Sequence, residues 1–173
     1  VHITGITPAL SDNLRTLALE FTRKARAAGV AVCVDVNYRS RLWDSKEARV
    51  ALLELCHEAP LVILTEEDAQ DVFELSGSSA KLATEAQKLF SAKYVALTRG
   101  ANGSILTDGN RSVEQAGMDA EVVDRIGRGA AFAAGLLLGT RRGEELLLEL
   151  FSFAIPGMRR SISRREAAAA TIA

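Results

Sequence analysis

Residues 29–43 read GVAVCVDVNYRSRLW, and this stretch decides the fold. Its first part, Val30–Val36, is a continuous apolar run rich in β-branched residues, which is typical of a parallel strand buried on both faces. Gly29 precedes the run and ends a helical pattern over Ser11–Ala28, as a glycine just beyond a helix does. A helix that leads directly into a buried strand indicates an α/β protein.

The same alternation of short apolar runs and longer helical periods extends along the chain. Further strands are predicted at Val1–Thr4, Leu61–Leu64, Tyr94–Thr98, Ser104–Thr107, Ser112–Gln115 and Glu121–Asp124. Helical periods predict further helices at Lys46–Glu58, Ser79–Ser91, Ala130–Leu138 and from Arg142 to about Ala154. Two more helices are predicted to begin at Thr65–Asp68 and at Ser163–Glu166, because both stretches have the residue order of a capping box. This pattern predicts one α/β domain over residues 1–173, with helices on both faces of the sheet.

Composition excludes several classes of protein. The net charge of −1 gives no bulk attraction to nucleic acid or to membranes. No run reaches the roughly 20 apolar residues that span a bilayer, and the start, VHITGITPAL, lacks the basic region of a signal peptide. Cys33 and Cys56 have no zinc-ligand spacing and are predicted to be buried free thiols in a reducing compartment, so we expect a cytoplasmic protein.

Three polar or glycine-rich stretches follow predicted strands, where ligands of open α/β sheets gather. The first holds Asp35, Asn37 and Arg39, every second residue of an extended chain, so that the three side chains would share one face. An acid, an amide and a guanidinium suit a polyhydroxylated ligand with a carboxylate, which Arg39 can bind in two-pronged fashion. The alternative is a polar strand end with Arg39 in a surface ion pair.

The second stretch runs from Thr98 to Gly103, where Gly100 and Gly103 allow a tight turn and a close approach of backbone to a ligand; a plain hairpin turn is the alternative. The third runs from Asp124 through Gly127, Arg128 and Gly129 into a helix of small residues. The N–H groups at the start of such a helix, together with its dipole, favour an anion.

Four segments in this order and spacing resemble the ribokinase (PfkB) family of carbohydrate kinases, and most closely its 2-keto-3-deoxygluconate kinases. They are HITGITPAL (residues 2–10), DVNYRSRLW (35–43), TRGANGSIL (98–106) and VVDRIGRGAAFAAGLLLG (122–139). The resemblance implies a three-layer α/β/α fold with a mostly parallel central sheet. It also implies that the N-terminal part of the family's domain, with its first strands and lid, would precede Val1.

By resemblance, the ligands are ATP, Mg²⁺ and a sugar acid. Arg39 would bind the substrate carboxylate, with Asp35 and Asn37 shaping the pocket. The nucleotide would be bound by residues Thr98, Gly100, Gly103, Asp124 and Arg128. Asp68 would assist the metal, in a motif where Thr65 replaces the family's asparagine and Asp68 its glutamate.

The family's catalytic signature, Gly-Ala-Gly-Asp, corresponds here to Gly127–Ala130. By resemblance Gly127 and Gly129 would form the anion hole, and position 130 would hold the aspartate that takes the proton from the sugar hydroxyl. Ala130 cannot accept a proton, and Asp124 lies too far along the chain to replace the base. Arg128 could contact phosphate or block the nucleotide.

The leading hypothesis is therefore a sugar kinase by descent, specific for an acid such as 2-keto-3-deoxygluconate, with impaired activity in this chain. The alternative is a non-catalytic protein on the same scaffold that binds a sugar acid or a partner. A third hypothesis, an unrelated nucleotide-binding domain, is disfavoured by residues 35–43. If the first strands are absent, a sheet edge and apolar faces are uncovered, and we expect a homodimer or poor solubility.

Overall fold

A computed structural model describes residues 1–117 and 127–141. The chain forms two compact units, Val1–Gly117 and Met118–Ala173. The first unit contains a six-stranded sheet and most of the helices, and the described part of the second is one helix, α6 (Arg128–Arg141). That the whole of 1–173 is part of one domain stays a prediction. The predicted strand at 121–124 and the predicted helices beyond Arg141 lie outside the described residues.

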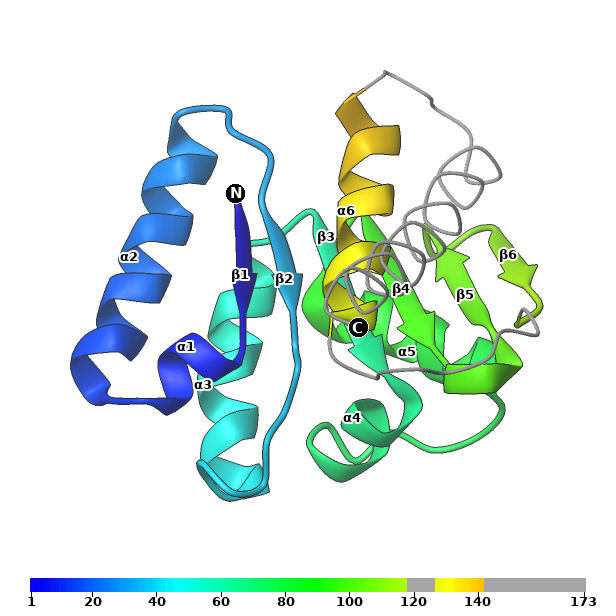
Figure 1. The fold of residues 1–173 in the computed structure, drawn as a ribbon, viewed down its shortest axis with the longest axis horizontal. Coiled ribbons are helices and arrows are strands. Elements are labelled where there is room, and N and C mark those ends of the chain that lie inside the picture. Colours follow the sequence, from blue (N-terminus) through cyan, green and yellow to red (C-terminus); the bar gives the residue numbers. More distant parts are fainter. Residues whose placement is uncertain (118–126, 142–173) are drawn as a thin grey trace, which may run out of the picture. The chain divides into compact units, whose positions relative to one another are not determined.

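The strands of the sheet follow one another in space as they do in sequence (Figure 1). They are β1 (His2–Thr4), β2 (Cys33–Asp35), β3 (Leu61–Thr65), β4 (Tyr94–Thr98), β5 (Ser104–Thr107) and β6 (Ser112–Gln115). Strands β1 to β4 pair in parallel, and β5 and β6 continue the sheet as antiparallel hairpins. The mostly parallel α/β sheet predicted from the sequence is confirmed.

Three long helices connect the parallel strands: α2 (Asp12–Ala27), α3 (Ser45–His57) and α5 (Ser79–Phe90). Because the parallel strands succeed one another in a constant direction, right-handed crossovers place all three helices on one face of the sheet. Ile3, Val34, Val62 and Val95 lie in register across the strands and belong to the core beneath these helices. Parallel strands read as apolar runs because they are buried in this way.

Most predicted helix ends are confirmed by their caps. Ser11 caps α2 through its side chain, and Gly29 follows that helix with a φ of 70°. Asp44 caps α3, because its carboxylate accepts a hydrogen bond from the Glu47 N–H (2.8 Å). Ser78 caps α5. Side-chain oxygens at these positions satisfy N–H groups that a helix leaves unpaired, so the sequence signal has a direct physical cause.

Two short elements were not predicted, and one strand is shorter than predicted. Helix α1 (Ile6–Ala9) and the 3₁₀ turn η1 (Gly100–Asn102) each span a single turn, too short to show a period. Strand β2 covers only Cys33–Asp35 of the predicted Val30–Val36, because only these residues have partners in both β1 and β3. Val30 is exposed, whereas the residues from Val32 to Val34 are buried.

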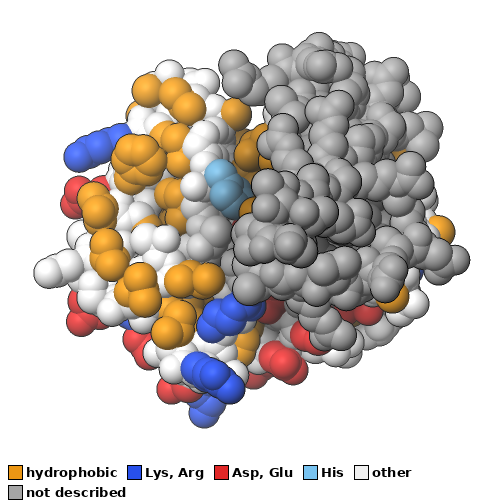
Figure 2. Space-filling model, viewed as in Figure 1, with side chains coloured by type: hydrophobic (Ala, Val, Ile, Leu, Met, Phe, Trp, Pro, Cys, Tyr) orange, Lys and Arg blue, Asp and Glu red, His pale blue; other side chains and the backbone are white. Residues whose placement is uncertain are grey.

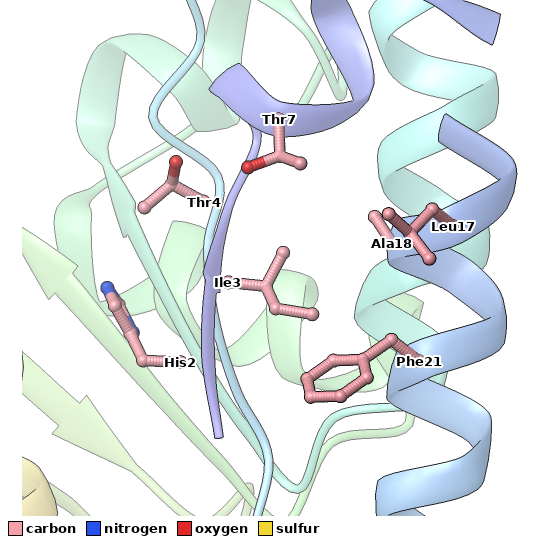
Figure 3. A pocket seen from close by; sticks show the side chains of 7 residues that line it. All are labelled: His2, Ile3, Thr4, Thr7, Leu17, Ala18 and Phe21. Atoms are coloured by element: carbon pink, nitrogen blue, oxygen red, sulfur yellow. The ribbon is translucent and has the colours of Figure 1, made fainter. Parts of the chain in front are cut away.

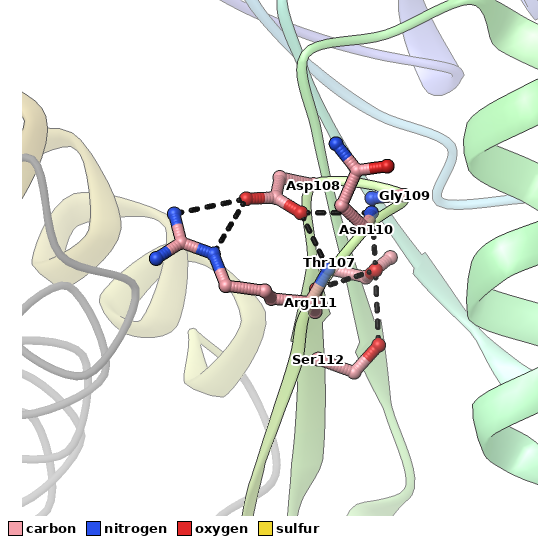
Figure 4. Close-up of polar contacts among 6 residues, drawn as sticks. All are labelled: Thr107, Asp108, Gly109, Asn110, Arg111 and Ser112. Carbon is pink, nitrogen blue, oxygen red and sulfur yellow. Dashed lines mark hydrogen bonds and ion pairs between the residues drawn. The ribbon is translucent and has the colours of Figure 1, made fainter.

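Residues Asp108–Asn110 form the turn between β5 and β6 (Figure 4). The Asp108 carboxylate accepts hydrogen bonds from the N–H groups of Asn110 (2.9 Å) and Arg111 (2.7 Å), while Gly109 takes a φ of 89°. The Thr107 hydroxyl donates to the Arg111 carbonyl oxygen and accepts from Ser112 and the Gly109 N–H. The turn is thus held by its own side chains and has a structural role.

Cys33 and Cys56 are free and buried, as predicted. Burial raises the pKa of Cys33 to about 12 and also raises that of Cys56, so both thiols stay protonated and unreactive at neutral pH. Among the described residues, no helix has the length and hydropathy needed to cross a bilayer.

Strand β1 forms one edge of the sheet, because among the described residues it pairs only with β2. A groove of about 340 Å³ runs between this strand and α2, lined by His2, Ile3, Thr4, Thr7, Leu17, Ala18 and Phe21 (Figure 3). Leu17 and Phe21 are 57% and 50% exposed, and hydrophobic side chains gather on this part of the surface (Figure 2). Such an edge favours association; the homodimer itself stays a prediction.

Candidate functional site

The carboxyl ends of β1 to β4 meet at one edge of the sheet, because these four strands are parallel and in register. Asp35 ends β2, Thr65 ends β3 and Thr98 ends β4. Thr65 and Thr98 are direct partners across β3 and β4, and the Thr98 hydroxyl donates to the Leu64 carbonyl oxygen (3.4 Å). The first two sequence-predicted stretches therefore start from the same edge.

Two carboxylates and one guanidinium interact at this edge. The pKa of Asp35 is raised to about 6, first by burial and then by the negative charge of Asp68, against the opposing effects of the Asn37 N–H and Arg39. The pKa of Asp68 is raised by burial and lowered in part by hydrogen bonds from Thr65 and by Arg39. Arg39 thus offsets the charge of both acids.

The chain brings Arg39 to both acids by turning, and the predicted extended geometry is wrong. Strand β2 ends at Asp35, Val36 is buried, and Asn37 adopts a left-handed backbone with a φ of 40°. Asparagine tolerates that region better than most residues because its short side chain can bond locally. The strand-to-turn change places the backbone N–H groups of Asn37 and Tyr38 toward Asp35 and Asp68 respectively.

Asp68 has a second task at the start of helix α4 (Glu66–Asp71). The Thr65 hydroxyl accepts a hydrogen bond from the Asp68 N–H (2.9 Å), and the Asp68 carboxylate accepts one from the Thr65 N–H (3.3 Å). This confirms the capping box predicted at Thr65–Asp68. The cap holds the Asp68 carboxylate at the strand end, and one of its oxygens is engaged there.

Arg39 is exposed, and its guanidinium donates to the Tyr38 carbonyl oxygen (2.8 Å). Five N–H groups are available to an arginine, so this bond leaves most of them for a ligand or for the two acids. The alternative predicted from the sequence, a surface ion pair, is absent from the ion pairs among the described residues.

The loop from Arg99 to Gly103 closes the β4–β5 hairpin through η1. Gly103 has a φ of 93°, and a Cβ on it would lie 1.9 Å from the Gln115 carbonyl oxygen, so its close approach is to the chain's own backbone. Gly100 has a φ of 57° and open space where a Cβ would be. Arg99 pairs with Glu114 of β6. These contacts account for the hairpin; a nucleotide role for the loop stays a prediction.

In the second unit, Gly127 has a φ of 83° and accepts the first hydrogen bond of the helix, from the Ala131 N–H (2.9 Å). Helix α6 starts at Arg128, two residues earlier than predicted, and Gly129 and Ala130 are exposed in its first turn. The predicted passage from glycine into helix is confirmed. Asp124 and the Arg128 side chain lie outside the described residues, and the roles of all these residues stay predictions.

Sequence reasoning missed three residues around Asp35–Trp43. Tyr38 donates its N–H toward Asp68 and its hydroxyl to the Trp43 carbonyl oxygen (3.2 Å). Trp43 is 6% exposed, and the Arg15 guanidinium carbon lies 5.6 Å from its ring centroid. Tyr38 and Trp43 lie within residues 35–43, which the sequence analysis singled out. Arg15 lies in α2, and no sequence pattern connected it to the site.

The raised pKa of Asp35 predicts a pH-dependent stability. The unfolded carboxyl titrates near 4, so between about pH 4 and pH 6 the folded chain binds more protons, and stability falls as the pH rises. We expect Asp35→Asn to weaken this fall and to raise the free energy of unfolding at pH 7 by roughly 1–2 kcal/mol. Asp68 acts in the same direction, so part of the slope remains.

Urea denaturation at intervals from pH 4 to pH 7 measures this. Asp71→Asn, at an exposed carboxylate near the end of α4, is the matched control. If the free energy of unfolding depended on pH in the same way in Asp35→Asn as in the unaltered chain, the raised pKa of Asp35 would be contradicted.

Comparison with known proteins tests the family resemblance predicted from the sequence. The family model described as pfkB family carbohydrate kinase matches residues 1–155. The chain is 36% identical over 143 residues to a 2-dehydro-3-deoxygalactonokinase of Haloferax volcanii, covering 83% of this chain and 45% of the relative. It is 31% identical over 153 residues to a 2-dehydro-3-deoxygluconokinase of Haemophilus influenzae, covering 84% and 48%.

A solved structure, the 2-dehydro-3-deoxygluconokinase of Thermotoga maritima, superposes with a TM-score of 0.78 at 25% identity, covering 88% of this chain and 52% of that one. The chain therefore spans about half the length of the relatives it matches. The predicted resemblance is confirmed: the chain belongs to the pfkB family of carbohydrate kinases.

Proposed function

We propose that this chain binds a 2-keto-3-deoxy sugar acid at the sheet edge formed by Asp35–Arg39. By descent it is part of a kinase that phosphorylates such an acid with ATP. Phosphoryl transfer is impaired in this chain. The observation that carries the proposal is the exposed Arg39, whose positive charge lowers the pKa of the half-buried Asp35 and of the buried Asp68. The relatives that are named as kinases of 2-dehydro-3-deoxy sugar acids support the class of ligand.

Each group at the edge has a role in the proposed binding. Arg39 donates two parallel hydrogen bonds to the ligand carboxylate, which suits its planar fork. Asp35 accepts from ligand hydroxyls when it is ionised, and Asn37 can donate and accept at the same rim. A bound ligand carboxylate adds a negative charge near Arg39. The Arg39 guanidinium would then offset the charge of the ligand as well as the charges of Asp35 and Asp68.

ATP and Mg²⁺ are the proposed co-ligands. Mg²⁺ is often held by one or two carboxylates together with the phosphates of a nucleotide, and the charges of Asp35 and Asp68 disfavour each other in a way that a cation would relieve. Asp68, already fixed by its cap, would hold the ion, whose chemistry is to neutralise charge on the phosphates. Thr98 and Gly100 would lie on the nucleotide side, with Asp124 and Arg128.

Position 130 is the reason for proposing impaired transfer. The exposed N–H groups at the start of α6, among them that of Gly129, are suited to an anion. However, Ala130 has no group that takes a proton, and no residue of α6 is acidic. A positioned general base contributes roughly 10²–10⁴-fold to such a reaction, so binding would persist while turnover falls.

A non-catalytic protein that binds a sugar acid on the same scaffold is the second candidate. It is favoured by the same pair of observations, the retained Arg39 and the absent base at Ala130. A cytoplasmic location is proposed for either candidate, since the free, buried Cys33 and Cys56 suit a reducing compartment.

A coupled ADP-release assay on the unaltered chain and on Ala130→Asp tests the kinase proposal. We expect no sugar-dependent ADP release from the unaltered chain, and a gain of about 10²-fold or more over that background in Ala130→Asp, because a base is restored. Ala134→Asp, one turn further along α6 at another exposed alanine, is the matched control.

The outcomes separate the two candidates. Turnover by the unaltered chain at the rate of ordinary sugar kinases would contradict the proposed impairment. No turnover in either chain, with sugar-acid binding intact, would favour the non-catalytic candidate.

Titration calorimetry with 2-keto-3-deoxygluconate tests the role of Arg39. We expect Arg39→Gln to weaken binding roughly 10- to 100-fold, because a charged hydrogen-bond pair to the carboxylate is lost. Arg41→Gln changes an exposed arginine of the same loop and should leave the affinity within about twofold, as most surface substitutions leave such properties unchanged. Equal affinities in all three chains would refute carboxylate recognition by Arg39.

A further inference from the structure

The segment from Val36 to Asp44 is attached to the rest of the first unit at both ends. At its start, the Val36 N–H donates to the Ile63 carbonyl oxygen of β3 (2.9 Å), and the Tyr38 N–H points to Asp68. At its end, the Asp44 carboxylate caps α3. Arg39 lies between these attachments, and its carbonyl oxygen accepts from the Leu42 N–H (2.9 Å).

Trp43 is the buried residue of the second attachment. Its side chain is in the hydrophobic core with 6% exposure, and its carbonyl oxygen accepts the Tyr38 hydroxyl (3.2 Å). The Tyr38 bond ties the residue just before Arg39 to the buried end of the segment. Any movement of Trp43 would therefore reach Arg39 through Tyr38 as well as along the chain.

Arg15 of α2 covers Trp43. Its guanidinium carbon lies 5.6 Å from the ring centroid, a distance at which a cation is attracted to an aromatic face. The same guanidinium pairs with Glu47 of α3, and Asp12 lies 3.8 Å away. Within the described residues, Arg15 Nε and Trp43 Nε1 are buried without a hydrogen-bond partner, so the contact between the two side chains is one of cation and ring.

Glu47 connects these contacts to the helix cap. Its N–H is the group that the Asp44 carboxylate caps, and its own carboxylate binds Arg15. Arg15 thus holds Trp43 directly and, through Glu47, the first turn of α3 on which the segment ends. Two elements far apart in the sequence, α2 and the Arg39 segment, are coupled at this point.

We propose that Arg15 is a positioning residue for the sugar-acid site: by holding Trp43 it fixes the segment that presents Arg39 to the ligand carboxylate. This inference rests on the proposed function, since it assigns Arg15 to the same binding site. Without Arg15 the segment has more conformations, and the ligand must order it on binding, which lowers affinity. Arg15 itself contacts no ligand.

The sequence contains a single tryptophan, so fluorescence excited at a wavelength that tyrosine does not absorb reports on Trp43 alone. The test compares the unaltered chain with Arg15→Gln, Arg15→Lys and Arg23→Gln. Arg23→Gln is the matched control, because Arg23 lies on the same helix and pairs with Glu58, which follows the C-terminal end of α3, whereas the segment ends at the start of that helix. Arg15→Lys keeps a cation that can lie over the ring.

Two measurements are made on each chain: acrylamide quenching of Trp43, and calorimetric affinity for 2-keto-3-deoxygluconate. In Arg15→Gln we expect quenching to rise about twofold or more and the affinity to fall about 5- to 20-fold, consistent with the cost of ordering a loosened segment. Arg15→Lys should recover part of both changes. Arg23→Gln should match the unaltered chain in both, with a similar melting temperature.

The results separate this inference from the proposed function. If the unaltered chain binds the sugar acid and Arg15→Gln binds it equally well, the positioning role is overturned and the proposed function stands. If Arg23→Gln loses affinity as much as Arg15→Gln, the effect is one of general stability and the inference is also overturned. If the unaltered chain does not bind the sugar acid, the proposed function is overturned together with the role that rests on it.

Discussion

The burial of two neighbouring carboxylates, with one guanidinium that partly offsets their charge, is the constraint on which the candidate site depends. Asp35 lies half-buried at the end of β2, Asp68 lies buried in the first turn of α4, and each has a raised pKa. Burying a charge is costly unless it is paired. Arg39 contributes a positive charge that lowers the pKa of both acids, and it does so from an exposed position that a ligand can also reach.

The fold creates this proximity and then fixes it. Parallel strands in register bring the ends of β2 and β3 together, and the Thr65–Asp68 capping box holds one acid where the helix begins. Beyond the turn at Asn37, the positive charge of Arg39 is near enough to lower the pKa of both acids. These are backbone constraints, so the site is set by the same hydrogen bonds that hold the sheet edge and the helix starts.

Membership of a carbohydrate kinase family suggests a ligand class for the cluster of Asp35, Asp68 and Arg39. Ala130 is the reason for proposing that phosphoryl transfer is impaired. The described start of α6 has the glycine turn and exposed first residues that suit an anion, but its sequence has no carboxylate. Under the proposed function, recognition and proton transfer would separate in this chain, because Asp35, Arg39 and Asp68 would bind the ligands while α6 contains no acidic residue. The relatives that are named as kinases of 2-dehydro-3-deoxy sugar acids are about twice as long as this chain.

Much of the fold could be predicted from the sequence, because its signals are local. Apolar runs predicted the parallel strands, and Ser11 and Thr65 marked helix starts through their own hydrogen bonds. Single-turn elements such as α1 were not predicted, because hydrophobic periodicity can be recognised only over more than one turn.

The candidate site was predicted less fully. Asp35, Asn37 and Arg39 were correctly located at a strand end, but by an extended geometry that Asn37 breaks with its positive φ. The approach of Asp68 to Asp35 and of Arg15 to Trp43 depends on tertiary packing, which spacing along the chain does not contain.

A carbon-detected NMR titration of the Asp35 carboxyl, in the unaltered chain and in Arg39→Gln, tests the central claim most directly. The account predicts a midpoint near pH 6 in the unaltered chain and a higher midpoint in Arg39→Gln, because the offsetting charge is removed. A midpoint near pH 4, or one that Arg39→Gln leaves unchanged, would contradict it.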